Sequence, residues 1–335
     1  MSQINLEPTN PEEEQLITSL RVGEWSQFFG QAKVKQSLSI ALTAASERGE
    51  AVDHILFYGP PGLGKTTLSH LIAKEMNSQL TITSGTALAK SSDLASILTN
   101  LQAKDVLFID EVHRLPKPVE EMLYTAMEDY ALDIVIGKGP SARTVRLDLP
   151  AFTLVGATTR FGALSAPFRD RFGVIHRMEY YQPQELEKII IQAAGLLGVE
   201  VDTDSLATIS KRARGTPRIA LKLLKRVRDY AQIKNGGLIS PAMVEASLKL
   251  LSIDELGLGH ADRVYLETII TKHAGGPVGL STLTAALSED AITLEEVVEP
   301  YLLQLGFIKK TPSGRVVSLA ACKHLGLKPP SNLQT

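Results

Sequence analysis

The alternation of apolar and polar positions divides the chain into a part with strands and a part with helices. Three apolar runs, 55–58, 106–109 and 152–157, have the length of buried strands; a Gly-rich loop follows the first, and polar residues directly follow the other two. The pattern predicts an α/β domain followed by a small helical domain, with Pro183 near the boundary. Over 184–250 apolar residues recur at helical spacing, as in Leu186, Ile189, Ile190, Ala193 and Leu197.

The pattern changes again after residue 253. Helical periodicity gives way to two short strand-like runs joined by a turn, and helices followed by such a β-wing predict a winged helix. Winged helices bind DNA in some proteins and protein partners in others, so the fold alone leaves both open. The expected elements are helices at 266–272, 280–287 and 293–305, and strands near 306–309 and 316–319.

The distribution of charge favours DNA for this region. From Tyr301 to residue 335 there is no Asp or Glu, whereas several Lys and Arg residues are present. Lys310 and Arg315 flank the wing turn, and we expect them to contact DNA phosphates without sequence preference. The formal net charge of the chain is −2, so contact with nucleic acid has to come from such a local patch.

Gly59 to Thr66 spell G-x-x-x-x-G-K-T directly after the first apolar run. Between a strand and a helix, the backbone N–H groups of such a loop cradle phosphates. Lys65 would then reach the β- and γ-phosphates, and the Thr66 hydroxyl would bind Mg²⁺. The bland alternative, a glycine turn in an α/β domain, leaves the Lys-Thr pair unexplained. The motif predicts that the chain binds a nucleoside triphosphate.

Polar residues at the ends of the other two runs fit the same chemistry. In P-loop enzymes an acid in the position of Asp110 holds Mg²⁺, and Glu111 is placed to polarise the attacking water. Thr158 and Thr159 follow the third run, where a hydroxyl can sense the γ-phosphate. Taken alone, a Thr pair after a strand is more often a cap or a turn, but the order of the three strands favours the functional interpretation.

Two arginines, Arg169 and Arg171, flank Asp170. They fit a solvated ion-pair network. They also fit an arginine finger that enters the nucleotide site of a neighbouring subunit. Their spacing does not decide between the two interpretations.

Two runs within the α/β domain, 132–137 and 143–149, predict a β-hairpin, with Gly137, Gly139 and Pro140 at its turn. Near the tip stand three consecutive aliphatic residues, more than a small hairpin buries by itself. They predict either a partner-binding surface or packing against the parent domain. The three residues are Ile134, Val135 and Ile136.

Composition excludes several classes of protein and limits the number of domains. A chain of 335 residues has room for two or three domains. Cys322 is the only cysteine, which excludes an intramolecular disulfide and a Cys-rich zinc site. No apolar run approaches the ~18–20 residues of a membrane span, and the polar, acidic N-terminus does not read as a signal peptide. We expect a cytoplasmic protein that does not contact a membrane.

The motifs together resemble those of the AAA+ ATPases. Two narrower segments, MEDYALDIVIGKGP (127–140) and GGPVGL (275–280), make the chain similar to the RuvB family, bacterial motors of Holliday junction branch migration. The resemblance extends from residue 20 to residue 330. The AAA+ segments are GPPGLGKTTL (59–68), VLFIDEVHRL (106–115), GATTR (156–160), APFRDRFG (166–173) and RARGTPRIA (212–220).

The resemblance also implies roles for single residues. It assigns the trans arginine finger to Arg171, with Arg169 as a rival. The residues that it places at the nucleotide and metal are Leu20, Arg21 and Tyr181 around the adenine, Gly62, Gly64, Lys65, Thr66 and Thr67 at the phosphates, Thr66 and Asp110 at Mg²⁺, Glu111 as activator of water, Thr158 as sensor 1, Arg218 as sensor 2, and Glu128, Asp129 and Tyr130 where a neighbouring subunit meets the nucleotide.

For the whole chain, the resemblance implies an α/β P-loop AAA+ core with an inserted hairpin, a helical lid and a C-terminal winged helix. The expected boundaries are 1–181, with 1–16 disordered, then 182–253 and 254–335. The implied cofactors are ATP and Mg²⁺, and the implied assembly is a homo-hexameric ring. The implied partners are duplex arms of four-way DNA junctions, a RuvA-type protein docked on the 132–149 hairpin, and a RuvC-type resolvase.

The implied activity is ATP-driven branch migration in recombination and repair. The core motifs also occur in AAA+ proteins of other classes. The alternative is therefore a clamp-loader-like or chaperone-type ATPase that remodels proteins. Stimulation of the ATPase by duplex DNA separates the two.

Overall fold

The computed structural model describes residues 20, 22–136 and 143–331, and the chain forms two compact units. Residues up to 185, together with 216–218, form the first, which we call the sheet unit. Residues 186–215 and 219–331 form the second, the helical unit. Three expectations lie outside the described residues: disorder of 1–16, the role of Arg21, and the hairpin turn at Gly137, Gly139 and Pro140.

The sheet unit is built on a parallel sheet, as the sequence predicts. Its strand order is β2-β3-β6-β1-β7, and every neighbouring pair is parallel. Because parallel neighbours need a crossover connection, helices run between the strands. The strands are β1 (Ile55–Tyr58), β2 (Leu80–Ser84), β3 (Val106–Asp110), β6 (Thr153–Thr158) and β7 (Val174–Arg177).

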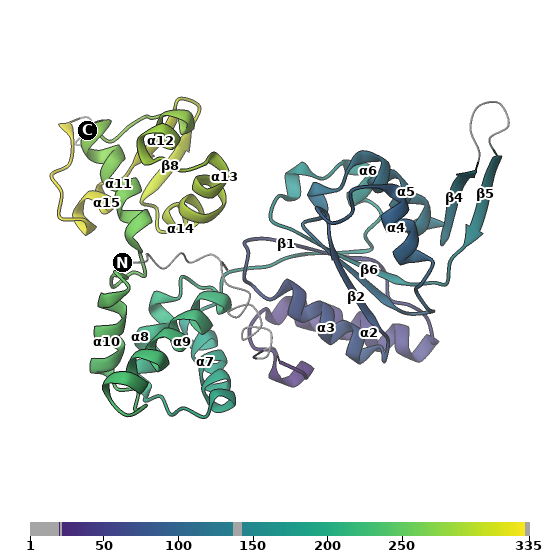
Figure 1. Ribbon diagram of the computed structural model, residues 1–335, viewed down its shortest axis with the longest axis horizontal. Helices are drawn as coiled ribbons and strands as arrows, with labels where there is room; N and C mark the ends of the chain where they lie inside the picture. Colours follow the sequence, from purple (N-terminus) through teal and green to yellow (C-terminus); the bar gives the residue numbers. More distant parts are fainter. Residues whose placement is uncertain (1–19, 21, 137–142, 332–335) are drawn as a thin grey trace. The chain divides into compact units, whose positions relative to one another are not determined.

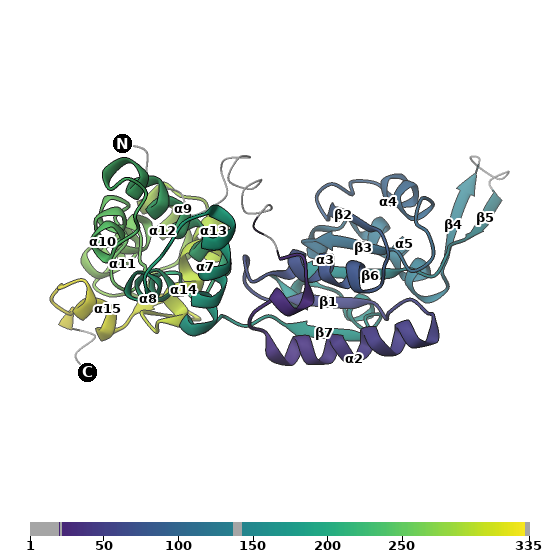
Figure 2. The same ribbon diagram turned by 90° about the horizontal axis from the view of Figure 1, so that it is seen from below.

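Helices cover both faces of the sheet, and successive strand residues face opposite layers. Leu107 and Ile109 of β3 belong to a buried cluster with Leu94, Leu123 and Phe168. Figures 1 and 2 show α2 and α3 on one face of the sheet and α4 and α5 on the other. The helices of this unit are η1 (Trp25–Gln27), α2 (Ala32–Arg48), α3 (Lys65–Glu75), α4 (Ser91–Leu98), η2 (Val112–Arg114), α5 (Lys117–Glu128), η4 (Phe161–Ala163) and α6 (Ala166–Arg169).

The inserted hairpin consists of β4 (Ala131–Ile136) and β5 (Arg143–Asp148), paired antiparallel. Ile134 is half-buried and packs against the main hydrophobic core, as the domain-packing interpretation expects, and its role in partner binding stays a prediction. The side chains of Val135 and Ile136 lie outside the described part. The exposed apolar residues are instead Val145 and Leu147 on β5, each 38% exposed.

The helical unit begins with four helices, which agree with the periodicity of 184–250. They are α7 (Pro183–Leu197), α8 (Thr203–Arg212), α9 (Pro217–Lys234) and α10 (Pro241–Leu250). None of the helices in the described ranges is both long enough and apolar enough to cross a membrane. The winged helix that follows has α11 (His260–Lys272), α12 (Leu280–Leu287), α13 (Ala291–Thr293), the π-helical turn η5 (Leu294–Val298), α14 (Glu299–Gln304), β8 (Ile308–Thr311), β9 (Gly314–Val317) and α15 (Leu319–His324).

The wing strands are displaced by about two residues from the positions expected from sequence. Thr311 pairs with Gly314, so the turn between β8 and β9 contains two residues. Leu319 leaves the strand because Ser318 caps α15 and accepts a hydrogen bond from the backbone N–H of Ala321. The expected helix 293–305 corresponds to η5 and α14, and α11 begins earlier than expected.

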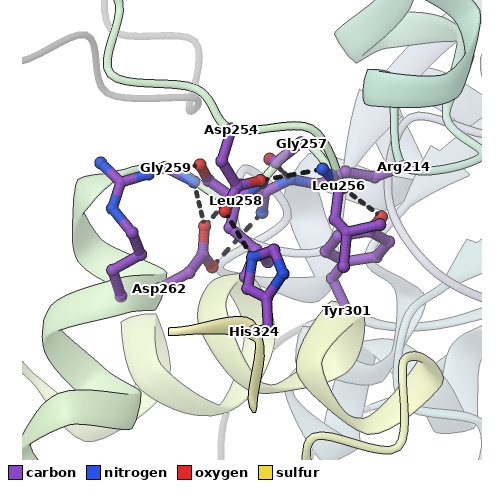
Figure 3. Close-up of polar contacts among 10 residues, drawn as sticks. Arg214, Asp254, Leu256, Gly257, Leu258, Gly259, Asp262, Tyr301 and His324 are labelled. Carbon is purple, nitrogen blue, oxygen red and sulfur yellow. Dashed lines mark hydrogen bonds and ion pairs between the residues drawn. The ribbon is translucent and has the colours of Figure 1, made fainter. Parts of the chain in front are cut away.

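A buried ion pair joins the four-helix part to the winged helix within the helical unit (Figure 3). Arg214 and Asp262 pair through side chains that are 6% and 4% exposed. The Arg214 guanidinium also donates to the Gly257 carbonyl oxygen at 2.8 Å and lies over the Tyr301 ring, 5.0 Å from its centroid. Asp262 accepts a further hydrogen bond from the Gly259 N–H at 2.7 Å. Each charge is thereby compensated where water is excluded.

The connecting segment between α10 and α11 is ordered by a second acid (Figure 3). Asp254 accepts hydrogen bonds from the backbone N–H groups of Leu256 and Leu258. Its other carboxylate oxygen lies 2.8 Å from Nε2 of His324 in α15. The turn that leads into α11 is therefore tied to the last helix of the winged helix.

We expect Asp262→Ala to lower the free energy of unfolding of the helical unit by about 3 kcal/mol, because it leaves the Arg214 charge buried and unpaired. Glu245→Ala is the matched control, since it removes a partner of Arg212 that is 57% exposed. That change should cost under about 1 kcal/mol. Urea unfolding followed by circular dichroism measures both. Equal small losses would show that the buried pair does not hold the two parts together.

Candidate functional site

The phosphate-binding loop lies between β1 and α3, in the strand–loop–helix arrangement that the motif requires. Lys65 begins α3 and is buried. Its Nζ donates to the carbonyl oxygens of Gly59 and Pro60 at 2.8 and 2.9 Å. Burial lowers the pKa of Lys65 to about 8; Asp110 and Glu111 act in the opposite direction, and Arg218 acts with burial. A negative phosphate group beside this ammonium would offset the cost of its burial.

The loop backbone has the shape that admits phosphates. Gly62 and Gly64 have φ values of 77° and 97°, a region that favours glycine. A Cβ on Gly62 would lie 2.8 Å from the Thr216 methyl group and 2.9 Å from the Arg218 Cβ. Gly62 thus allows the 216–218 segment of the sheet unit to pack on the loop. The Arg218 N–H also points to the Gly62 carbonyl oxygen at 3.4 Å.

The polar ends of β3 and β6 lie at the same edge of the sheet as this loop. In the parallel register Tyr58 of β1 is opposite Thr158 of β6, and β6 lies next to β3, which ends at Asp110. Thr66 occupies the first turn of α3. A hydroxyl and a carboxylate are oxygen ligands of the kind that Mg²⁺ takes together with phosphates and water. The donor set therefore fits a magnesium–nucleotide complex.

Glu111 stands directly after β3 in a left-handed conformation, with φ of 50°. Its Oε2 accepts a hydrogen bond from the Thr159 hydroxyl at 3.2 Å. The same oxygen lies 3.0 Å from Nδ1 of His113, and that nitrogen is also 2.9 Å from Oγ1 of Thr158. Because a carboxylate only accepts, Nδ1 has to carry the hydrogen for this bond. The carboxylate is therefore held in place by two side chains.

His113 is a site neighbour that the sequence motifs alone do not indicate. The structure brings it against both the expected activator of water and the expected γ-phosphate sensor, with 5% of its side chain exposed. The only sequence feature that points to His113 is its position in VLFIDEVHRL (106–115), two residues after Glu111. Its contact depends on the short η2 turn, which reverses the chain directly after β3.

Of the residues expected around the adenine, Tyr181 lies beside the loop. Leu20 and Tyr181 are buried, and the Tyr181 hydroxyl donates to the Leu63 carbonyl oxygen at 3.1 Å. A Cβ on Gly64 would lie 3.2 Å from the Phe28 ring. Phe28 is therefore a further apolar neighbour of the loop that sequence reasoning missed. Burial raises the pKa of Tyr181, so its hydroxyl stays protonated and can donate.

The residues expected to serve a neighbouring subunit gather near α6 and the end of α5. Arg171 pairs with Glu128 at 3.0 Å and donates to the Pro167 carbonyl oxygen at 2.6 Å. Its guanidinium lies over the Tyr124 ring, 4.3 Å from the centroid. The rival Arg169 instead lies over Phe161, at 5.1 Å.

Asp129 and Tyr130 differ in their surroundings. Asp129 is exposed and pairs with Arg146 of the hairpin at 2.7 Å. Tyr130 is half-buried, and its ring meets Phe152 edge-on with centroids 5.9 Å apart. The position of Tyr130 therefore indicates a packing role at the foot of the hairpin in addition to the one expected from the resemblance.

The two expected DNA contacts are not free cations. Lys310 and Arg315 both pair with Glu299, at 2.6 and 2.8 Å, and Arg315 also pairs with Glu295 at 2.9 Å. Only 13% of the Arg315 side chain is exposed, against 43% for Lys310. Both acids precede the wing in sequence, as expected, but η5 and α14, which carry them, bring them into contact with its two cations.

We expect His113→Ala to lower the rate of ATP turnover about tenfold or more while ATP affinity changes little, because the positioned carboxylate loses a donor. His113→Asn should recover part of the rate, since its amide nitrogen can take the place of Nδ1. Steady-state ATPase assays with nucleotide-binding titrations separate the two effects. Arg114→Ala, which changes an exposed neighbour, is the control. A loss of affinity equal to the loss of rate would contradict a role in positioning Glu111.

Three models of known families match consecutive parts of the chain. The Holliday junction DNA helicase RuvB P-loop domain matches residues 20–178. The RuvB AAA lid domain matches 181–254, and the RuvB C-terminal winged helix domain matches 255–326. A curated relative, the Holliday junction branch migration complex subunit RuvB of Dehalococcoides mccartyi, is 56% identical over 93% of this chain and 89% of its own length.

Solved structures agree with this assignment. The structure titled as the Holliday junction branch migration motor RuvB of Thermotoga maritima is 49% identical and has a TM-score of 0.85, covering 93% of this chain and 99% of that one. A point mutant of the same protein gives a TM-score of 0.86 at the same identity, covering 93% of this chain and 100% of its own. The fold, the arrangement of the site and the matches along nearly the whole length agree: the chain belongs to the RuvB family of P-loop AAA+ proteins.

Proposed function

We propose that this protein is an ATP-driven motor that moves duplex DNA during branch migration of four-way junctions. The observation that carries the proposal is that the phosphate-binding loop and the polar ends of β3 and β6 lie at one sheet edge, in a chain that also carries a winged helix. The relatives are named as branch migration proteins. The proposed domains are 1–181 for the ATPase, 182–253 for the lid and 254–335 for the winged helix.

In the proposed site, Lys65 holds the β- and γ-phosphates, while Thr66 and Asp110 hold Mg²⁺. The ion supplies a positive charge that offsets charge on the phosphates. Glu111 accepts a proton from the attacking water, and the donors from Thr159 and His113 keep its carboxylate oriented. Thr158 contacts the γ-phosphate, and Arg218 approaches it from the segment that packs on Gly62. Leu20, Arg21 and Tyr181 surround the base.

Arg171 is proposed to complete the site of a neighbouring subunit, with Glu128, Asp129 and Tyr130 on the same face. Its guanidinium is partly exposed and is held by groups near α6 and α5. A finger acting in trans requires a closed ring, and six subunits is the assembly that the family resemblance implies.

The hairpin is proposed to dock a RuvA-type junction-binding protein. Val145 and Leu147 alternate with polar residues on β5 and present apolar surface on a strand that is exposed throughout. Surface of this kind suits a partner with an apolar patch. A RuvC-type resolvase belongs to the proposed larger complex.

We expect Arg171→Ala and Glu111→Gln each to abolish ATP turnover, whereas a mixture of the two variants regains activity. In a ring, a site with catalytic residues from one variant and a finger from the other is complete. Random mixing forms such sites at about a quarter of the interfaces. ATPase assays on mixtures with an increasing ratio of one variant to the other measure the recovery of turnover. Mixtures in which Arg169→Ala replaces Arg171→Ala serve as the comparison for the rival arginine. An inactive mixture would show that Arg171 does not act in trans.

The experiment that tests the function is dissociation of a synthetic four-way DNA junction with ATP, Mg²⁺ and a RuvA-type partner. We expect strand separation by the wild type and none by Glu111→Gln. Duplex DNA should also stimulate ATP hydrolysis. ATP hydrolysis without separation and without stimulation by DNA would favour the alternative, a clamp-loader-like or chaperone-type protein remodeller.

A further inference from the structure

Four charged side chains meet at the base of the wing, and we call them the wing-base cluster: Glu295, Glu299, Lys310 and Arg315. The two cations are on β8 and β9, directly opposite each other in the hairpin register. Glu295 belongs to η5, and Glu299 begins α14. The π-helical turn that carries Glu295 leads directly into the turn that carries Glu299, and such turns are frequent at functional sites.

Glu299 is the buried member of the cluster. Its side chain is 0% exposed and makes hydrogen bonds or ion pairs with three side chains. Oε1 accepts from the Arg315 Nε at 2.8 Å and from the Tyr265 hydroxyl at 2.8 Å, while Oε2 lies 2.6 Å from the Lys310 Nζ. Burial alone would raise the pKa of Glu299, but the donors Arg315, Lys310 and Tyr265 outweigh burial and hold the pKa below its ordinary value. Glu299 is therefore ionised and fixes both cations.

Glu295 reaches the same two cations from the solvent side. Its Oε1 lies 2.9 Å from the Arg315 Nη2 and 3.9 Å from the Lys310 Nζ, and its side chain is 43% exposed. A carboxylate there takes the place that a phosphate oxygen of DNA would take between an arginine and a lysine. The formal charges of the cluster sum to zero, so as it stands it offers DNA no net attraction.

The backbone under Arg315 is also fixed. The Arg315 N–H donates to the Val278 carbonyl oxygen at 2.8 Å, and its own carbonyl accepts from the Val278 N–H at 3.0 Å. A Cβ on Gly276 would collide with the Arg315 carbonyl oxygen. The GGPVGL segment (275–280) thus packs against the backbone of β9. Arg315 is held through both its backbone and its side chain.

We propose that Glu299 is a positioning residue that fixes Lys310 and Arg315 as one binding site for a backbone phosphate of duplex DNA, and that Glu295 competes with this phosphate for the same two cations. The inference rests on the proposed function, which supplies the ligand. Displacement of Glu295 by DNA leaves a local net charge of one positive unit, and the carboxylate returns to the cations when the phosphate leaves. A motor that steps along DNA needs contacts that release as readily as they form.

The two glutamates therefore have opposite expected effects. Glu295→Gln should tighten binding to duplex DNA about threefold, the size of one exposed ion pair, and steepen the dependence of log affinity on log salt by about 0.9. Glu299→Gln should weaken binding about fivefold although it also removes a negative charge, because the two cations lose their common acceptor. Glu296→Gln is the matched control: it makes the same change of charge one residue away, and no ion pair with Glu296 is seen among the described residues.

The measurement is fluorescence anisotropy of a labelled duplex, with the full chain assembled in the presence of a slowly hydrolysed ATP analogue, over a series of salt concentrations. Equal tightening by all three substitutions would overturn the proposal, because general electrostatics would then explain the result. Urea unfolding shows whether Glu299→Gln unfolds the winged helix. If it does, the difference in DNA affinity between Glu295→Gln and Glu296→Gln by itself tests whether Glu295 competes with phosphate.

Lys310→Ala separates this inference from the proposed function. Weaker binding by Lys310→Ala, with no difference between the Glu295 and Glu296 variants, would reject the competing role of Glu295 and leave the DNA motor intact. Failure of the wild type to bind duplex DNA would reject the proposed function itself.

Discussion

The buried ion pair of Arg214 with Asp262 makes the four-helix part and the winged helix one body. Its two members come from segments 48 residues apart in sequence, and both lie where water is excluded. Arg214 also stands four residues before Arg218, which belongs with the phosphate-binding loop in the sheet unit. The connection between them includes Gly215, with φ of 66°. Along the chain, the buried ion pair therefore lies four residues from the proposed sensor arginine, Arg218.

The proposed catalytic set rests on local sequence pattern and on one rule of parallel sheets. Lys65 closes the G-x-x-x-x-G-K-T loop that follows the first apolar run, and Asp110 and Thr158 directly follow the other two runs. Parallel strands bring such ends to one edge. His113 escapes this reasoning. It comes into contact with Glu111 and Thr158 only because the chain turns through a left-handed residue directly after β3, and no apolar periodicity records such a turn.

The winged helix shows that the order of charged residues along the sequence does not give the charge of a surface. The sequence beyond Tyr301 contains only basic charges, which favours an open cationic wing. The structure folds η5 and α14 against that wing, so Glu295 and Glu299 neutralise it. Ile134 is a similar case, since its place in an apolar run near the hairpin tip says nothing of the core residues that meet it. In both cases the sequence does not record contacts between elements, which tertiary packing decides.

The same competition between carboxylate and phosphate applies to the proposed interface between subunits. Arg171 rests on Glu128, whose side chain is 57% exposed, so exchange of this partner costs little, under about 1 kcal/mol for a surface pair. If Arg171 acts as the proposed finger, a γ-phosphate in the neighbouring site would be a more strongly charged acceptor and would attract the guanidinium away from Glu128. After release of phosphate, Glu128 would again be the better partner. In the proposed finger and in the proposed wing site alike, a carboxylate that holds the cation between encounters would make attachment to phosphate reversible.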